Sequence, residues 1–379
     1  MYRYVLIGAL AAFLVWFGTF AEGRVVSRGS KRACVILCYV LAALVFCIAA
    51  GVRDVQVGTD VAMYVIPSFD AAQQMGFWEF ATQGEFARWM PFSKILFWLI
   101  PNATHSLVCL LFMIHAVTVI PLFVALRSVL KDKAWIGVLV FGIAFFPLSL
   151  NIMRQFMGMG FVLLSYLFVR KRKPVAFLLF IVIAAMFHET SFLGLLIYPI
   201  WLASSGSLER INVQPAVFGV ASLAVIQIFY PALKLIDVLF GRYGFYLHPR
   251  TGFVWGAGAD EFCFLVVVCI VLGVLYYLQM GRKKPGTSSE LSGIAAIVFF
   301  GIAAFSTCFF LFQLFRTGIF FLYFAVLLIP FAYENIPARK GQLEFLAVSI
   351  ALLMLFGQIY YGTGAHEVIP YVIGLSEGL

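Results

Sequence analysis

The sequence places a histidine and a carboxylate side by side in the segment Phe187-His188-Glu189-Thr190-Ser191. The apolar runs on either side are shorter than the roughly 20 residues needed to cross a bilayer. Ionisable groups at membrane depth are costly and rare unless they serve a function. Because the pKa of an imidazole lies near neutral pH, His188 is the first candidate for a general base. The alternative, a packing histidine satisfied by hydrogen bonds, is disfavoured by its position at a broken helix beside Glu189.

Arginines are the second group of residues that could do chemistry. Arginine is always charged, and its paired N–H donors match phosphate oxygens. Arg154 and Arg316 start predicted helices on the side of the membrane that normally carries few basic residues. We therefore expect them to bind an anion such as a phosphate group at the outer membrane surface. The alternative is that both reach the lipid head groups.

Further cations and one further acid are candidates for the same site. The weaker anion-binding candidates are Arg53, Arg88, Arg242 and Arg250. Arg53 could instead pair with Asp54 or Asp60, and the loop arginines could simply be solvated. Asp60 is the second candidate for the general base, and it could instead orient an acceptor or an arginine.

Composition defines the protein class that must position these residues. The chain of 379 residues is 63% hydrophobic and only 11% charged, whereas about a quarter of the residues in soluble domains are charged. We predict an all-α polytopic integral membrane protein, with residues 1–379 as a single domain. The net charge of +9 lies mostly in short loops between apolar runs, where it marks topology, and nucleic acid is not an expected partner.

The apolar runs predict about twelve spans with both chain ends outside. The expected spans cover residues 4–20, 33–51, 106–126, 134–150, a return to Arg170, 174–187, 191–203, 216–235, 262–280, 291–312, 317–333 and 345–361. Residues 174–187 and 191–203 are counted as two short passes because this keeps Arg282-Lys283-Lys284 in the cytoplasm. Such short passes must lie against protein or a wet cavity.

Two polar stretches are expected on the outer side. Residues 52–103 form the first periplasmic loop, with an interfacial helix over 69–86 and a re-entrant segment over 92–100. Residues 236–261 form the second. Residues 4–20 are expected to be a retained first helix, since no clear cleavage site follows them.

The remaining candidate ligands carry no predicted chemistry. Seven cysteines lie in or at the edge of apolar runs without zinc-type spacing to histidines, so neither a disulfide nor a metal site is predicted. His115 lies mid-span and is expected to be a hydrogen-bonded packing residue. His248, His366 and Glu367 are expected at the surface.

Several short motifs, taken in order, resemble the EpsG-like family of polysaccharide polymerases. They are Gly51-Val52-Arg53-Asp54 with Val57-Gly58-Thr59-Asp60 and Tyr64, then Asn151-Ile152-Met153-Arg154-Gln155, Phe187-His188-Glu189-Thr190-Ser191, Arg316, and Ile369-Pro370-Tyr371. The resemblance covers nearly the whole chain. Glu189 departs from the pattern, because family members often carry a basic residue there.

The resemblance implies a Wzy-type glycosyltransferase with a fold similar to that of C-type membrane glycosyltransferases. No metal or cofactor is expected, because Arg154 and Arg316 could stabilise the charge on the leaving pyrophosphate in place of a metal. Such enzymes work on the periplasmic face of the bacterial inner membrane in O-antigen or exopolysaccharide synthesis. They transfer a growing glycan from undecaprenyl pyrophosphate to the sugar of another lipid-linked repeat unit. The implied partners are that lipid-linked oligosaccharide, membrane lipids, a chain-length regulator and a flippase. Tyr64, Gln155 and Glu189 join the expected substrate-binding residues.

Two other functions are compatible with parts of the pattern. A lipid-linked oligosaccharide flippase or other transporter would also use broken helices near a polar site, but it should carry charges through the bundle. A membrane acyltransferase that modifies a polysaccharide could use a mid-membrane histidine such as His115. Its acyl donor would come from the cytoplasmic side, where the sequence offers no catalytic cluster.

Overall fold

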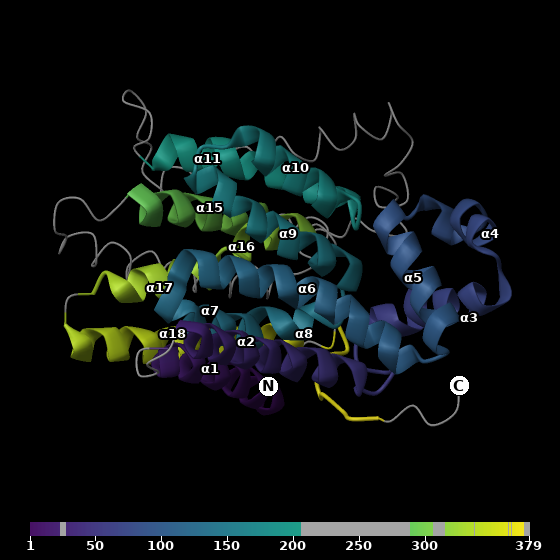
Figure 1. Cartoon of the computed structure of the whole chain (residues 1–379), viewed down its shortest axis with the longest axis horizontal. Coiled ribbons are helices and arrows are strands. Elements are labelled where there is room, and N and C mark those ends of the chain that lie inside the picture. Colours follow the sequence, from purple (N-terminus) through teal and green to yellow (C-terminus); the bar gives the residue numbers. More distant parts are fainter. Residues whose placement is uncertain are drawn as a thin grey trace. The chain divides into compact units, whose positions relative to one another are not determined.

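The computed structural model describes residues 1–22, 28–205, 289–305, 315–336, 338–362, 364 and 366–374 (Figure 1). In these residues the chain is helical, and the extended pairing is limited to one antiparallel bridge between Arg53 and Ile373. Five helices in this part of the chain are long and apolar enough to cross a membrane. The predicted spans over 216–235 and 262–280 and the loop 236–261 lie outside the described residues.

The described residues fall into two compact units, Met1–Phe192 with Phe345–Leu379, and Leu193–Glu344. In the first unit, five helices pack side by side (Figure 1). In order of contact they are α1 (Tyr2–Glu22), α2 (Arg28–Gly51), α6 (Leu107–Leu130), α9 (Met153–Arg170) and α10 (Pro174–Ala185). The 24 residues of α6 extend about 36 Å at 1.5 Å per residue, which exceeds the roughly 30 Å of a hydrocarbon core.

The span predicted over residues 134–150 is broken into three segments. These are α7 (Ala134–Val140), a π-helical turn over Phe141–Phe145, and α8 (Phe146–Ser149). The π turn lies against α1, where a Cβ added to Gly142 would lie 2.4 Å from the Gly8 Cα. Glycine therefore permits a backbone contact that no other residue allows.

The predicted interfacial and re-entrant segments form a lobe of short helices beyond the end of α6 (Figure 1). The lobe contains α3 (Ile66–Gln74), α4 (Phe77–Thr82) and α5 (Pro91–Thr104). Its interior is aromatic, with rings of Phe80, Phe86, Trp89 and Phe97 in successive contact. Trp78 is 77% exposed, as expected for a ring at a membrane interface.

The break after α10 occurs where the sequence predicts it. The helix ends at Ala185, a 3₁₀ turn covers Glu189–Leu196, and α11 (Ile197–Ser204) follows. The carbonyls freed by the break are satisfied by α5, because Phe92 N donates to Met186 O at 2.9 Å and Ser93 Oγ donates to Phe187 O at 2.7 Å. The break therefore lies against protein, as free backbone groups in a membrane require.

The second unit is built around α15 (Ser289–Phe305), which packs against α11, α16 (Phe315–Leu322) and α17 (Ala325–Glu334). The close approach of α15 to α16 depends on glycine, since a Cβ on Gly318 would lie 2.3 Å from Phe305 N. The last helix, α18 (Arg339–Gly362), begins in this unit and continues in the first.

The ends of several first-unit helices meet at one end of α1. The Arg3 guanidinium donates to Tyr371 O, and the Tyr4 hydroxyl donates to Val368 O. At the other end of α1, about 30 Å away by helix length, Glu22 pairs with Arg127 at 2.8 Å. The segment 366–374 thus lies at the end of the unit that holds the start of α1.

Gly58 allows a test of how closely the loop after α2 packs against Leu150. Its φ is +95°, and an added Cβ would lie 2.6 Å from Leu150 O. Gly58→Ala should therefore lower the melting temperature of the purified protein. Backbone strain alone should reduce the free energy of unfolding by about 1–3 kcal/mol, and the steric clash with Leu150 O should reduce it further. Two controls separate these causes. Gly84 has φ +63° with open space, and Gly76 has open space and negative φ, so Gly84→Ala should cost less and Gly76→Ala almost nothing. Equal melting temperatures for all three variants would contradict the close contact between Gly58 and Leu150 O.

Candidate anion site

Arg53 follows directly after α2 and is held by the C-terminal segment. Asp54 N donates to Val372 O at 2.9 Å, and Gly374 N donates to Val52 O at 3.2 Å. These bonds fix the backbone on both sides of Arg53, and the residue is only 1% exposed. The sequence therefore buries a complete guanidinium at this point.

The Arg53 side chain has few hydrogen-bond partners. Its Nη2 lies 3.1 Å from the Met153 sulfur, and its Nε and Nη1 are buried without a partner among the described residues. Burial lowers the pKa of the guanidinium to about 10, so Arg53 remains charged at neutral pH. Four nearby groups oppose this shift in the Arg53 pKa, namely Tyr4, Tyr371, Tyr64 and Asp60.

Arg154, unlike Arg53, lies over the faces of two aromatic rings. Its Cζ lies 4.8 Å from the Tyr64 ring centroid and 4.2 Å from that of Trp89. Aromatic faces attract a cation, by about 0.5–2 kcal/mol per contact. Arg154 is half-buried, and its Nε has no hydrogen-bond partner among the residues described. Tyr64 links the two arginines, because its ring lies under Arg154 and it is also one of the groups that raise the Arg53 pKa. We therefore treat Arg53 and Arg154 as one candidate site.

Asp60 and Tyr64 are positioned by the loop that follows Arg53. Asp60 is 9% exposed and precedes the π-helical turn over Val61–Val65, which carries Tyr64. The Asn151 Oδ1 accepts from Thr59 Oγ1 at 2.8 Å and from Asp60 N at 3.0 Å. π turns are frequent at functional sites because they re-aim side chains, and here the turn brings an aromatic ring under Arg154.

His188 is half-buried, and its side chain contacts Thr190 in the turn that follows it. Its Nδ1 lies 2.6 Å from Thr190 Oγ1 and accepts from Thr190 N at 3.3 Å. An Nδ1 that accepts from a backbone N–H carries no proton, so in the neutral imidazole the proton is on Nε2. Phe187 belongs to the same hydrophobic cluster as Trp89 and Met153, which places the break beside the core that supports Arg154.

The other predicted site residues have different positions. Arg88 is exposed at the end of a 3₁₀ turn over Glu85–Arg88. Gln155 is buried, with its Nε2 3.9 Å from the Met159 sulfur, and Glu189 is half-buried at the start of its turn. Arg316 is half-buried in α16 of the second unit. Arg242, Arg250 and His248 lie outside the described residues.

Two residues of the site, Trp89 and His366, were not predicted from the sequence. Trp89 supports Arg154 but was not singled out, although it adjoins Arg88 in an aromatic stretch. His366 was expected at the surface, and this was wrong, because it is 2% exposed and bonds to Asn151. Its position depends on a C-terminal segment that folds back onto the loop after α2. Local sequence carries little signal for such a long-range contact.

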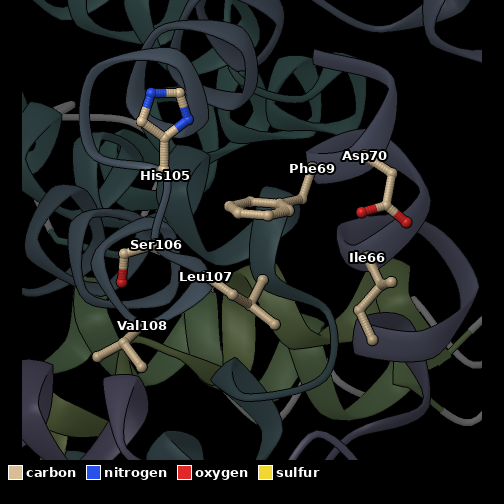
Figure 2. A pocket seen from close by; sticks show the side chains of 7 residues that line it. All are labelled: Ile66, Phe69, Asp70, His105, Ser106, Leu107 and Val108. Carbon is tan, nitrogen blue, oxygen red and sulfur yellow. The ribbon is translucent and has the colours of Figure 1, made fainter. Parts of the chain in front are cut away.

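A small cavity of about 130 Å³ lies away from the arginines, between α3 and the start of α6 (Figure 2). Phe69 and Leu107 line it, and Asp70 and His105 stand on either side of the Phe69 ring. Ligand pockets are usually at least about 300 Å³. This cavity is too small for a glycan, and none of the predicted site residues lines it.

The fold and the site define the class as an all-helical, multi-pass membrane protein with a buried cationic centre at one end of a helix unit. The chain belongs to the EpsG family, whose model matches residues 36–373. The match confirms the resemblance drawn from the sequence motifs and identifies a membrane protein of the polymerase type in polysaccharide biosynthesis. No curated protein and no solved structure matched the chain.

Arg53 yields a prediction that separates function from stability. Even a buried ion pair can often be replaced by apolar residues of similar volume with a neutral or stabilising effect, and a buried charge without an ion-pair partner has less to lose. Because Arg53 contacts a methionine sulfur and has no carboxylate partner among the described residues, Arg53→Met should preserve or raise the melting temperature of the ligand-free protein in detergent. Arg53→Lys is the matched control that keeps a positive charge. A clear fall in melting temperature with Met but not with Lys would show that the charge supports the fold instead.

Proposed function

We propose that the protein polymerises the repeat units of a bacterial surface or secreted polysaccharide, as a glycosyltransferase of the Wzy type. It transfers a growing glycan from undecaprenyl pyrophosphate to the sugar of another lipid-linked repeat unit. The observation that carries this proposal is the burial of Arg53 without a carboxylate hydrogen bond, with Tyr64 near both Arg53 and Arg154. A lipid pyrophosphate supplies acceptors for the Arg53 Nε and Nη1, which have no hydrogen-bond partner among the described residues.

The leaving group of the reaction determines the role of the arginines. The bond between the anomeric carbon of the donor sugar and the pyrophosphate oxygen breaks, and its electron pair stays on that oxygen. Arg154 and Arg53 stabilise the resulting charge. Fixed donors aimed at developing charge are often the largest catalytic contribution. Arg316 is proposed as a third cation on the strength of its sequence position.

The acceptor hydroxyl forms the new bond to the anomeric carbon and loses its proton to a base. Both His188 and Asp60 are candidates, and the hydrogen bonds favour Asp60. The His188 Nδ1 already accepts from Thr190, so its Nε2 carries a proton and acts as a donor. Asp60 is near Arg53 and is fixed through its own backbone N–H. We assign the proton transfer to Asp60, and His188 donates from Nε2 to a sugar or phosphate oxygen.

The proposed setting is the bacterial inner membrane, with the arginine site facing the periplasm. The support for this orientation is the positive-inside pattern of the sequence. The proposed partners are the lipid-linked oligosaccharide, a chain-length regulator and a flippase that delivers the substrate to the outer leaflet. An experiment in vesicles distinguishes a polymerase from a flippase. A polymerase elongates glycan on lipid carriers supplied on the side that the arginine site faces, without moving them across the membrane.

Arg154→Lys should shorten the polymer strongly in a strain that depends on this protein. Lysine cannot form paired contacts to phosphate or stack its charge on Tyr64 and Trp89 in the same way. Single repeat units should therefore accumulate on the lipid carrier, measured by gel electrophoresis of the lipid-linked glycan. Arg88→Lys is the matched control, because Arg88 is exposed and normal chain length is expected. Normal chain length with Arg154→Lys at normal protein level would refute its role.

The choice between the two bases has its own test in the purified enzyme. Asp60→Asn should reduce turnover by about 10²–10⁴-fold, the usual contribution of a general base. His188→Asn keeps an acceptor for Thr190 and should reduce turnover much less. If the order were reversed, with His188→Asn the more damaging change, the proton transfer would belong to His188.

A further inference from the structure

A chain of hydrogen bonds joins the C-terminal segment to Asp60 through one carboxamide. Asn151 is 2% exposed, and its Oδ1 accepts from Thr59 Oγ1 and Asp60 N at 2.8 and 3.0 Å. Its Nδ2 lies 2.8 Å from His366 Nδ1. On the far side of the ring, His366 Nε2 lies 2.9 Å from the Tyr360 hydroxyl. The series of hydrogen bonds therefore runs from Asp60 to Tyr360 through buried groups.

The donor and acceptor chemistry of these groups fixes which atom donates in each of these hydrogen bonds. The Asp60 backbone N–H can only donate, so the Asn151 atom that faces it is the oxygen. The opposite atom is then the amide nitrogen, which also can only donate. His366 Nδ1 must therefore accept, and the proton of the neutral imidazole lies on Nε2, where it donates to Tyr360. An imidazolium would place an N–H against the Asn151 NH₂ group.

His366 also supports the same loop through its backbone. Thr59 N donates to His366 O at 3.4 Å, and the preceding Gly58 N donates to Glu367 O at 2.9 Å. Side chain and main chain of one C-terminal residue thus hold two successive residues, Thr59 and Asp60. The reach is long in sequence, because the Asn151–His366 pair joins residues 215 positions apart.

We propose that His366 is a positioning residue, whose neutral imidazole orients the Asn151 carboxamide and thereby fixes the Asp60 backbone beside Arg53. The inference deepens the proposed function and rests on it. His366 touches no reacting atom in this scheme. Its loss lets Asn151 rotate, and displacement of a reacting group by about 1 Å can reduce a rate about 10²-fold.

Kinetics of the purified polymerase test the proposal. His366→Ala should lower kcat about 10- to 100-fold with little change in KM for the lipid-linked repeat unit, because the arginines remain in place. His366→Asn, whose Oδ1 can replace Nδ1 as acceptor, should restore most of kcat. The double variant Asn151→Ala with His366→Ala should lose no more than Asn151→Ala alone, since coupled residues are not additive. A raised KM with unchanged kcat, no rescue by Asn, or additive losses would each overturn the proposal.

A second measurement is independent of catalysis. In protein with ¹⁵N-labelled histidine, the His366 signals, assigned by comparison with His366→Asn, should report an unprotonated Nδ1 and a protonated Nε2 at neutral pH. Asn151→Ala should shift the Nδ1 signal. An imidazolium or the opposite tautomer would overturn the positioning role even if the enzyme is active. Wild-type protein that shows the expected tautomer but elongates no glycan would instead refute the proposed function.

Discussion

The candidate site is organised around one buried charge, the Arg53 guanidinium, whose Nε and Nη1 have no hydrogen-bond partner among the described residues. Moving a cation out of water costs several kcal/mol even after relaxation. Arg53 meets that cost with a sulfur contact and with the phenol groups and the Asp60 carboxylate that raise its pKa. This environment preserves the charge but does not neutralise it. Such an arrangement suits a group that meets an anion during function, because a permanent carboxylate partner would compete with a phosphate.

The surrounding elements keep this charge in place. The C-terminal segment pairs with the residues on both sides of Arg53, and the start of α1 bonds to the same segment through Arg3 and Tyr4. Arg154 lies at the start of α9, where the unpaired N–H groups of a helix terminus add positive potential. The start of α1 and the C-terminal segment therefore hold the backbone beside Arg53, and the start of α9 carries Arg154.

The sequence predicted the parts of this arrangement that depend on local pattern. Apolar runs gave α1, α2, α6 and α18 closely, and the polar break at His188 lies where the run after Lys173 ends. Segment 134–150 was less predictable, because its π turn depends on packing between Gly8 and Gly142. The site residues Arg53, Asp60 and Arg154 were selected by type and predicted level, and Tyr64 by the family resemblance. Trp89 and His366 were not, since their roles come from contacts across the fold.

A structure of the protein with a short-chain lipid pyrophosphate bound in a membrane mimetic tests the central claim most directly. The account predicts pyrophosphate oxygens within hydrogen-bond distance, about 2.7–3.2 Å, of the Arg53 and Arg154 guanidinium groups. The Arg53 Nε and Nη1 should then have partners. A pyrophosphate held elsewhere, with Arg53 still contacting only the Met153 sulfur, would contradict the account.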